Sequence, residues 1–199
     1  MTLPIVLGST SPFRKAILEK LQIPFQCSAP NIDENAQPDE NPKDLVARLA
    51  FEKATEVAKV HDSSLIIGSD QVAVVGNQIL GKPHTHDNAV QQLQNSSGQV
   101  VTFLTGLCLY NSHNHTSETI VEPFEVHFKD LSTEEIENYL QLETPYKCAG
   151  SFKSEAAGIA LFEKLSGDDP NTLIGLPLIQ LIKMLKKQGL DVLSLARQS

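Results

Sequence analysis

Two segments that lead from an apolar run directly into a polar loop constrain the fold more than any other feature of the chain. Ile5–Leu7 is typical of a buried strand, and the loop 8–11 after it leads into a helix with Pro12 at its first position and Ser11 as the N-cap. Leu65–Asp70 is a second apolar strand, and it ends on a carboxylate. Units of strand, loop and helix build α/β sheets, so we expect an α/β fold.

The rest of the chain alternates helices with strands. The first helix should extend to about Leu21 and pack through Phe13, Ala16, Ile17 and Leu21. Further helices are expected from Asn41-Pro42 onward, from His86-Asp87 to about Asn95, from the capping box Ser132–Glu135 to about Leu142, and at Leu178–Lys187, where Gly189 stops the last helix. Strands are expected at Phe25–Ser28, Gln71–Val75, Gln78–Leu80, Val100–Tyr110, Ile120–Phe128 and Gly158–Phe162, with turns at Gly76-Asn77 and 170–172 and an irregular segment at Tyr146–Glu155.

This order predicts one domain over residues 1–199 with a mixed sheet, because strands and helices alternate early and a long hairpin lies in the middle. The formal net charge of −8 argues against a nucleic-acid polymer or an acidic membrane as partner, since such proteins need a positive field. Three cysteines without a CxxC pair indicate reduced thiols and a cytoplasmic protein. We see no signal peptide and no stretch as long as a membrane helix.

Several cations and hydroxyls fall where a phosphate group could be bound. Ser9, Ser11 and Arg14 surround the start of the first helix, whose N–H groups and dipole favour an anion. Taken alone, the loop is better explained by an ordinary capped helix with solvated cations, because no full P-loop or GxGxxG motif is present. Lys53 lies in the apolar stripe of the second helix, so its ammonium either reaches the surface or meets an anion. Lys82, between Gly81 and Pro83, could face the same anion.

Carboxylates supply the candidate catalytic and metal-binding groups. Asp70, at the end of an apolar strand, could orient a water, accept its proton or bind a divalent metal, and the alternative is a turn-forming aspartate. Glu34 follows Asp33 in a polar loop and is a further candidate metal ligand, unless the loop is simply solvated. The histidines show no zinc spacing, and no Gly-x-Ser-x-Gly elbow is present. Cys148, which precedes Ala149-Gly150, is predicted to be structural rather than nucleophilic.

Taken together, ordered segments along nearly the whole chain resemble the Maf family of nucleotide pyrophosphatases. They are Gly8–Lys15, Asp33-Glu34, Leu49–Ala54, Gly68–Gln71, Gly81–Pro83, and Ser151–Glu155 with Gly158-Ile159. The resemblance implies a Maf-like, ITPase-like fold of two lobes with a cleft between them, and hydrolysis of an α–β phosphate bond with Mg²⁺ or Mn²⁺. It also implies Asp70 as proton acceptor, and a homodimer is the family expectation. Residues that match the family's phosphate- and metal-handling positions are Ser9, Arg14, Glu34, Lys53 and Lys82.

Three positions indicate which nucleotide is bound. Phe13, Gln71 and Glu155 depart from the commonest Maf pattern of Arg, Thr and Gln, and this combination resembles the subfamily that hydrolyses 7-methyl-GTP. That subfamily often has Trp where this chain has Phe13. The cationic ring of 7-methylguanine gains from an aromatic face and a nearby carboxylate. Two alternatives stay open: cleavage of other nucleoside triphosphates, and a nucleotide-binding regulator of cell division.

Overall fold

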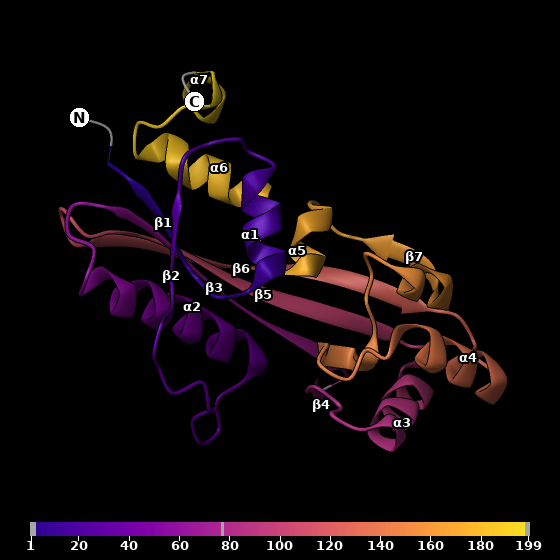
Figure 1. Cartoon of the computed structure of the whole chain (residues 1–199). Helices are drawn as coiled ribbons and strands as arrows, with labels where there is room; N and C mark the ends of the chain where they lie inside the picture. Colours follow the sequence, from indigo (N-terminus) through magenta and orange to yellow (C-terminus); the bar gives the residue numbers. More distant parts are fainter. Residues whose placement is uncertain (1–2, 77, 198–199) are drawn as a thin grey trace. The chain divides into compact units, whose positions relative to one another are not determined.

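The computed structural model describes residues 3–76 and 78–197. In chain order the elements are β1 (Ile5–Gly8), α1 (Pro12–Glu19), β2 (Gln26–Ser28), α2 (Pro42–Ala58), β3 (Leu65–Val75), β4 (Gln78–Leu80), α3 (His86–Ser96), β5 (Val100–Asn111), β6 (Thr116–Phe128), α4 (Thr133–Glu143), the 3₁₀ helices η1 (Ala149–Ser151) and η2 (Ala157–Leu161), β7 (Phe162–Ser166), α5 (Pro170–Ile174), α6 (Leu178–Lys187) and α7 (Val192–Ala196) (Figure 1).

Over the described residues the strands form one seven-stranded mixed sheet in the order β2-β1-β3-β5-β6-β7, with β4 paired to β3. β1 is parallel to both β2 and β3, whereas the β3–β4 and β6–β7 pairs are antiparallel. The expected mixed α/β sheet is therefore confirmed. No helix of the described residues has the length and apolar character needed to cross a membrane.

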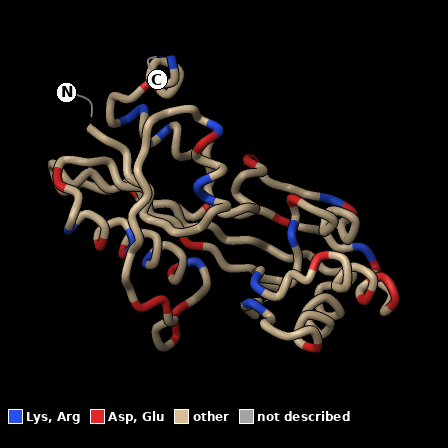
Figure 2. Tube along the Cα trace, viewed as in Figure 1, with Lys and Arg blue, Asp and Glu red and all other residues tan. Residues whose placement is uncertain are grey.

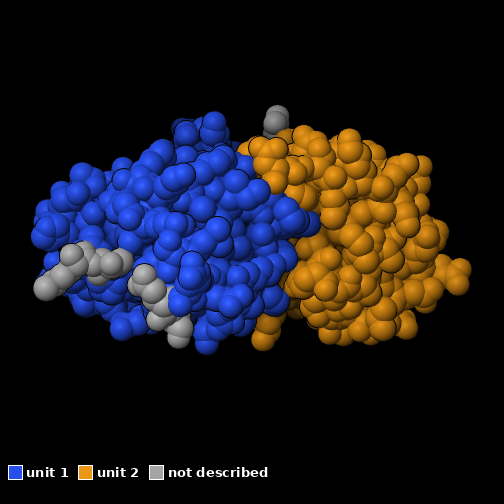
Figure 3. All heavy atoms as spheres, turned by 90° about the horizontal axis from the view of Figure 1, so that it is seen from above, with its two compact units in different colours: residues 1–71, 105–122, 169–199 blue, residues 72–104, 123–168 orange. Residues whose placement is uncertain are grey.

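The chain divides into two compact units, coloured separately in Figure 3. Unit 1 comprises residues 1–71, 105–122 and 169–199, and unit 2 comprises residues 72–104 and 123–168. Strands β3, β5 and β6 run from one unit into the other.

Alternation along the strands of unit 1 gives the sheet two buried faces. Ile5 and Leu7 of β1 belong to a core with α1 and α6, whereas Val6 packs with Ala50 and Ala54 of α2 on the other face. Side chains of a strand point alternately to opposite faces, so both layers of helices are specified by one short run. Figure 1 shows α2 on one side of β1 and β3, with α1 and α6 on the other.

Unit 2 is centred on aromatic side chains. Phe152, after η1, packs edge-on against Phe103, Phe128 and Phe162, with ring centroids 4.9 to 5.4 Å apart. Edge-to-face pairs at this separation are favourable beyond the area that they bury. The segment after η1, which leads to Glu155, is therefore fixed at one end by a packed ring.

Several expected boundaries are wrong. β3 is one continuous strand to Val75, so Asp70 lies within the strand and not at its end. Residues 170–174 form the short helix α5 rather than a turn, because Asp169 caps its N-terminus and Gly175 ends it with a φ of 113°. Within 158–162, most residues belong to η2, and the strand begins at Phe162. A further helix, α7, follows α6.

The structure also shows the extent of the first helix and the pairing of the expected hairpin. Helix α1 ends at Glu19 and packs through Ile17 and Leu18, while Phe13 is 47% exposed and Ala16 is exposed too. The expected hairpin exists as the antiparallel pairing of Val75 with Gln78, but the turn residue Asn77 lies outside the described residues.

Candidate active site

A buried lysine that contacts two carboxylates is the main feature of unit 1. Lys53 of α2 is 5% exposed, and its Nζ lies 2.7 Å from Oδ1 of Asp70 and 2.9 Å from Oε1 of Glu34. The lysine therefore does not extend to the surface. Its charge is matched by Asp70, which is 8% exposed, and by Glu34, whose side chain is 60% exposed. A buried ammonium requires partners of this kind.

The close approach of α2 to the sheet brings Lys53 to Asp70. A Cβ on Gly68 of β3 would lie 2.0 Å from the carbonyl oxygen of Ala50, and one on Gly106 of β5 would lie 2.1 Å from that of Val46. The backbone of α2 thus lies directly on these two strands, which only glycine permits. Lys53 follows Ala50 by about one helical turn, and Asp70 follows Gly68 by two residues on β3.

The register of the sheet explains how Asp70 comes to lie past the end of a neighbouring strand although it is itself within a strand. β1 ends at Gly8, which is paired with Gly68. β3 continues past this point, so Asp70 lies beyond the carboxyl end of its parallel neighbour. Ligands of α/β proteins bind outside the carboxyl ends of the parallel strands. The prediction that Asp70 ends its own strand was wrong, because β3 continues to Val75. Asp70 nevertheless lies past the carboxyl end of the neighbouring parallel strand β1.

The loop after β1 forms the expected helix start. Ser11 accepts a hydrogen bond from the N–H of Arg14 at 3.4 Å, and the buried Ser9 accepts one from the N–H of Ser11 at 3.1 Å. These two N–H groups are thereby used inside the loop. The hydroxyls of Ser9 and Ser11 act only as acceptors in these bonds, so each can still donate its proton to a phosphate oxygen.

Arg14 is held through one edge of its guanidinium. Its Nε donates to the carbonyl oxygen of Gly175 at 3.0 Å, and Ser69 donates to the same oxygen at 2.8 Å. Burial lowers the pKa of Arg14, while Asp70 and then Glu34 raise it. Arg14 therefore lies within electrostatic reach of both carboxylates, and an arginine stays charged under such conditions.

Glu34 is carried by an acidic loop, visible as red segments between β2 and α2 in Figure 2, and Arg48 of α2 holds this loop. Arg48 binds both carboxylate oxygens of Glu40, at 2.6 and 2.8 Å, and its Nη2 donates to the carbonyl oxygen of Asn35 at 3.0 Å. Two-point pairing of this kind fixes orientation as well as distance. Arg48 and Glu40 were missed in the sequence because their charges look like those of a solvated loop and helix face.

The Arg48–Glu40 pair predicts a pH dependence of stability. The hydrogen bond from Arg48, with one from the N–H of Gln37, lowers the pKa of Glu40 from 4.5 to about 2. A lowered folded-state pKa stabilises the fold above the unfolded value, and this contribution is lost as pH falls from about 4.5 toward about 2. Glu40→Gln should therefore flatten the dependence of the free energy of unfolding on pH in this window. Urea titrations across the window measure it, with Glu56→Gln on α2 as the matched control. Equal slopes for wild type and Glu40→Gln would contradict the prediction.

Lys82 and Glu155 both lie in unit 2, near Cys148. Burial raises the pKa of the Cys148 thiol, Glu155 raises it further, and Lys153 and Lys82 lower it. All three charges are therefore close enough to act on one thiol. A raised pKa makes Cys148 a poor nucleophile, in agreement with its structural interpretation. Lys82 and Glu155 are themselves exposed.

Glu143, at the end of α4, holds the loop that carries Glu155. Its Oε1 accepts from the N–H of Ala157 at 3.0 Å, and its Oε2 pairs with Lys153 Nζ at 3.1 Å. These contacts lower the pKa of Glu143. A Cβ on Gly158 would lie 2.3 Å from the carbonyl oxygen of Lys153, so the chain folds back on itself here. This local turn overrides the strand expected from the apolar run at 158–162.

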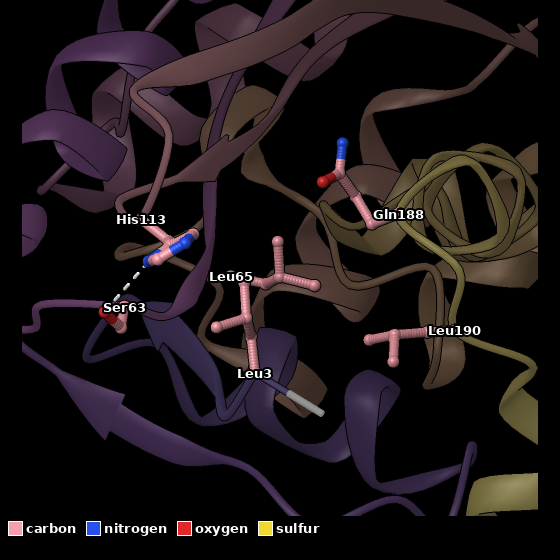
Figure 4. Close-up of a pocket in the computed structure, with 6 residues that line it drawn as sticks. All are labelled: Leu3, Ser63, Leu65, His113, Gln188 and Leu190. Atoms are coloured by element: carbon pink, nitrogen blue, oxygen red, sulfur yellow. Dashed lines mark hydrogen bonds between the residues drawn. The ribbon is translucent and has the colours of Figure 1, made fainter. Parts of the chain in front are cut away.

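A cavity of about 620 Å³ in unit 1 shares no residue with the predicted site. It lies near Leu65, the first residue of β3, whereas Asp70 is five residues further along that strand. The Ser63 hydroxyl lies 3.3 Å from Nδ1 of His113, and Figure 4 shows this pair together with three leucines that line the same cavity. The lining residues are Leu3, Ser63, Leu65, His113, Gln188 and Leu190.

The residues present fit a divalent metal that is bound together with a phosphorylated ligand. Among the described residues, no group of three or more His, Cys, Asp or Glu could hold a metal ion. Asp70 and Glu34 nevertheless bring two carboxylates to one ammonium. Magnesium in nucleotide sites is commonly held by one or two carboxylates, with phosphate oxygens and waters completing the octahedron. The donor set therefore suits a metal whose remaining ligands come from a phosphorylated molecule and from water.

Comparison with known proteins identifies the family. The profile of the family described as "Maf-like protein" matches residues 4–188. The chain therefore belongs to the Maf family.

One named relative and one solved structure are also similar to the chain. A protein of Colwellia psychrerythraea named 7-methyl-GTP pyrophosphatase is 62% identical over 190 residues, which cover 96% of this chain and 95% of that protein. The Ham1 protein of Staphylococcus aureus matches 64% of this chain and 72% of its own, with a TM-score of 0.47 and 11% identity. That structural likeness is too weak to inform the site.

Proposed function

We propose that the protein is a nucleoside triphosphate pyrophosphatase that hydrolyses 7-methyl-GTP to 7-methyl-GMP and pyrophosphate. The observation that carries the proposal is the contact of Lys53 with Asp70 and Glu34, past the carboxyl end of β1. The 62% identity to a relative named for this activity supports it.

In the proposed reaction the cations bind the phosphates. Arg14 and Lys53 in unit 1 and Lys82 in unit 2 neutralise the triphosphate, and the hydroxyls of Ser9 and Ser11 donate to its oxygens. A divalent metal, which Glu34 and Asp70 would hold, supplies positive charge to the phosphate oxygens. Phosphoryl chemistry of this kind depends on positioning and charge more than on a covalent nucleophile.

Asp70 is the proposed proton acceptor. Its Oδ1 accepts a hydrogen bond from Lys53 Nζ at 2.7 Å, which fixes the position of the carboxylate. Asp70 takes one proton from a water whose oxygen bonds to the α-phosphorus, and the bond from this phosphorus to the bridging oxygen breaks. Pyrophosphate leaves with its negative charge matched by the cations.

Phe13, Gln71 and Glu155 are the proposed specificity residues. Phe13 is 47% exposed in the first turn of α1, so its ring is available for stacking on a base rather than buried in the core. A methylated guanine carries a positive charge, which an aromatic face and a carboxylate both stabilise. Glu155 could accept hydrogen bonds from N1–H and the exocyclic amine of the base through its two oxygens, whereas glutamine has only one side-chain oxygen.

A substrate panel tests the proposal. The purified protein is incubated with Mg²⁺ and each of the four common ribonucleoside triphosphates or 7-methyl-GTP, and pyrophosphate and orthophosphate are measured separately. We expect pyrophosphate from 7-methyl-GTP at a kcat/KM well above that for GTP. Orthophosphate release would contradict pyrophosphatase activity, and equal rates on GTP and 7-methyl-GTP would contradict the specificity. Tight binding without turnover would favour a regulator.

Glu155→Gln should weaken the discrimination between 7-methyl-GTP and GTP. Loss of the carboxylate removes a charge-assisted hydrogen bond of about 1.5–3 kcal/mol to the cationic base, so the ratio of the two kcat/KM values should fall roughly 10- to 100-fold. Steady-state kinetics on both substrates measure the ratio. Glu163→Gln, at an exposed position in β7, is the matched control. A ratio unchanged in Glu155→Gln would remove this residue from base recognition.

We further propose that the protein acts on free nucleotides in the cytoplasm. Its thiols support this, because Cys27, Cys108 and Cys148 are free. The homodimer stays a prediction that light scattering of the purified protein would test.

A further inference from the structure

The side-chain amide of Gln71 is bound on one edge by three acceptors. Its Nε2 lies 2.8 Å from the hydroxyl oxygen of Thr105, 2.7 Å from the carbonyl oxygen of Thr172 and 3.3 Å from that of Leu173. Thr172 and Leu173 belong to α5, and Thr105 belongs to β5. Three segments that are distant in sequence thus meet at one amide.

These partners determine which way the amide points. Carbonyl oxygens can only accept, so they require Nε2 and exclude the flipped amide, in which Oε1 would face two carbonyls. Oε1 must therefore point away from α5. A Cβ on Gly175 would lie 3.8 Å from this oxygen and 3.3 Å from Nε of Arg14, so Oε1 lies on the same side of Gly175 as the Arg14 guanidinium.

Thr105 completes this arrangement. It is fully buried, and its hydroxyl donates to the carbonyl oxygen of Thr172 at 3.0 Å while it accepts from Gln71. Because its proton is committed to Thr172, the hydroxyl can offer Gln71 only a lone pair. A buried polar group with every partner in place holds its neighbours in one geometry, and removal of one partner leaves the others unsatisfied.

We propose that Thr105 is a positioning residue for nucleotide recognition. It holds Gln71 so that this side chain presents a carbonyl oxygen, and not an N–H, to the nucleotide. Gln71 then recognises a hydrogen-bond donor of the substrate that Glu155 leaves free, such as the second N–H of the exocyclic amine or a ribose hydroxyl. The inference rests on the proposed pyrophosphatase function and extends it to a residue that does not itself contact the nucleotide.

The test compares two substitutions of Thr105. Thr105→Val keeps the shape and removes the hydroxyl, whereas Thr105→Ser keeps the hydroxyl. We expect Thr105→Val to raise KM for 7-methyl-GTP about tenfold, with kcat within about twofold of wild type, because an interaction shared by bound substrate and transition state is weakened. Thr105→Ser should restore KM to within about twofold of wild type. Thermal unfolding of each variant is measured alongside.

A Gln71→Leu background separates positioning from general packing. If Thr105 acts through Gln71, adding Thr105→Val to Gln71→Leu should raise KM no further, whereas independent effects would multiply. In the wild-type protein, the side-chain N–H signals of Gln71 in a ¹⁵N spectrum should exchange slowly with solvent, and in Thr105→Val faster.

The outcomes distinguish failure of the proposed function from failure of the positioning role of Thr105. A wild-type protein that does not hydrolyse 7-methyl-GTP would overturn the proposed function. A wild-type protein that does so, with Thr105→Val at wild-type KM, would overturn the positioning role alone. A lower melting temperature in Thr105→Val without any change in KM would assign Thr105 to stability, which also overturns it.

Discussion

Asp70→Asn is expected to lower kcat for 7-methyl-GTP by about 10²- to 10⁴-fold, the range that a positioned general base contributes. Asparagine keeps the size of the side chain and one oxygen, but it cannot take the proton of the attacking water. Because Lys53 then loses one of its two carboxylate partners, the variant should also be less stable than wild type. Single-turnover kinetics and urea unfolding measure the two effects separately.

The metal and base roles of Asp70 are separable in the same experiment. Recovery of wild-type kcat in Asp70→Asn at saturating Mg²⁺ would mean that Asp70 acts through the metal and not as a base. Near-normal turnover with an unchanged pH dependence would exclude both roles. Asp62→Asn, at an exposed position shortly before β3, controls for the loss of one negative charge.

Lys53→Met should damage both folding and turnover. Asp70 would remain buried without its cation, and breaking a buried ion pair costs about 3–5 kcal/mol; we expect about 3 kcal/mol, since solvent reaches the other partner, Glu34. Without the ammonium the site also loses a phosphate ligand, so kcat/KM should fall at least about 100-fold. Urea unfolding and steady-state kinetics measure these losses.

Lys59→Met, at the C-cap of the same helix, is the matched control. Lys59 pairs with Glu56 at an exposed position, with 69% of its side chain accessible, so its loss should change the free energy of unfolding by no more than about 1 kcal/mol. If Lys53→Met were as mild as this control in both measurements, the contact with Asp70 and Glu34 would have no energetic role.

Local signals in the sequence predict much of the fold. Ser11 and Pro12 mark the start of α1, and the capping box Ser132–Glu135 marks that of α4, as the structure confirms. The apolar stripe of α2 places Lys53 near buried surface but leaves open whether its ammonium extends to solvent, and the structure shows the side chain buried. Such signals succeed because they depend on hydrogen bonds and periodicities within a few residues.

The supporting contacts of the site could not be predicted in this way. Thr105 and Gln71 meet across 34 residues, and Ser69 and Gly175 across 106. A threonine inside an apolar strand gives no sign of its partner, since β-branched residues favour strands for packing alone. Helix α5 did carry a local signal, because Asp169-Pro170 at its start and Gly175 at its end follow the usual asymmetry of helix ends.

The glycines beneath α2 determine what can change the distance from Lys53 to Asp70. Because main-chain atoms of α2 rest on Gly68 and Gly106, no side chain acts as a spacer between the helix and these strands at those two points. Conservative substitutions elsewhere in the core of unit 1 should therefore lower the free energy of unfolding before they alter this distance. A single methyl group at Gly68 would instead push α2 and Lys53 away from the sheet together. The smallest possible change of side chain should therefore have the largest effect on the distance from Lys53 to Asp70.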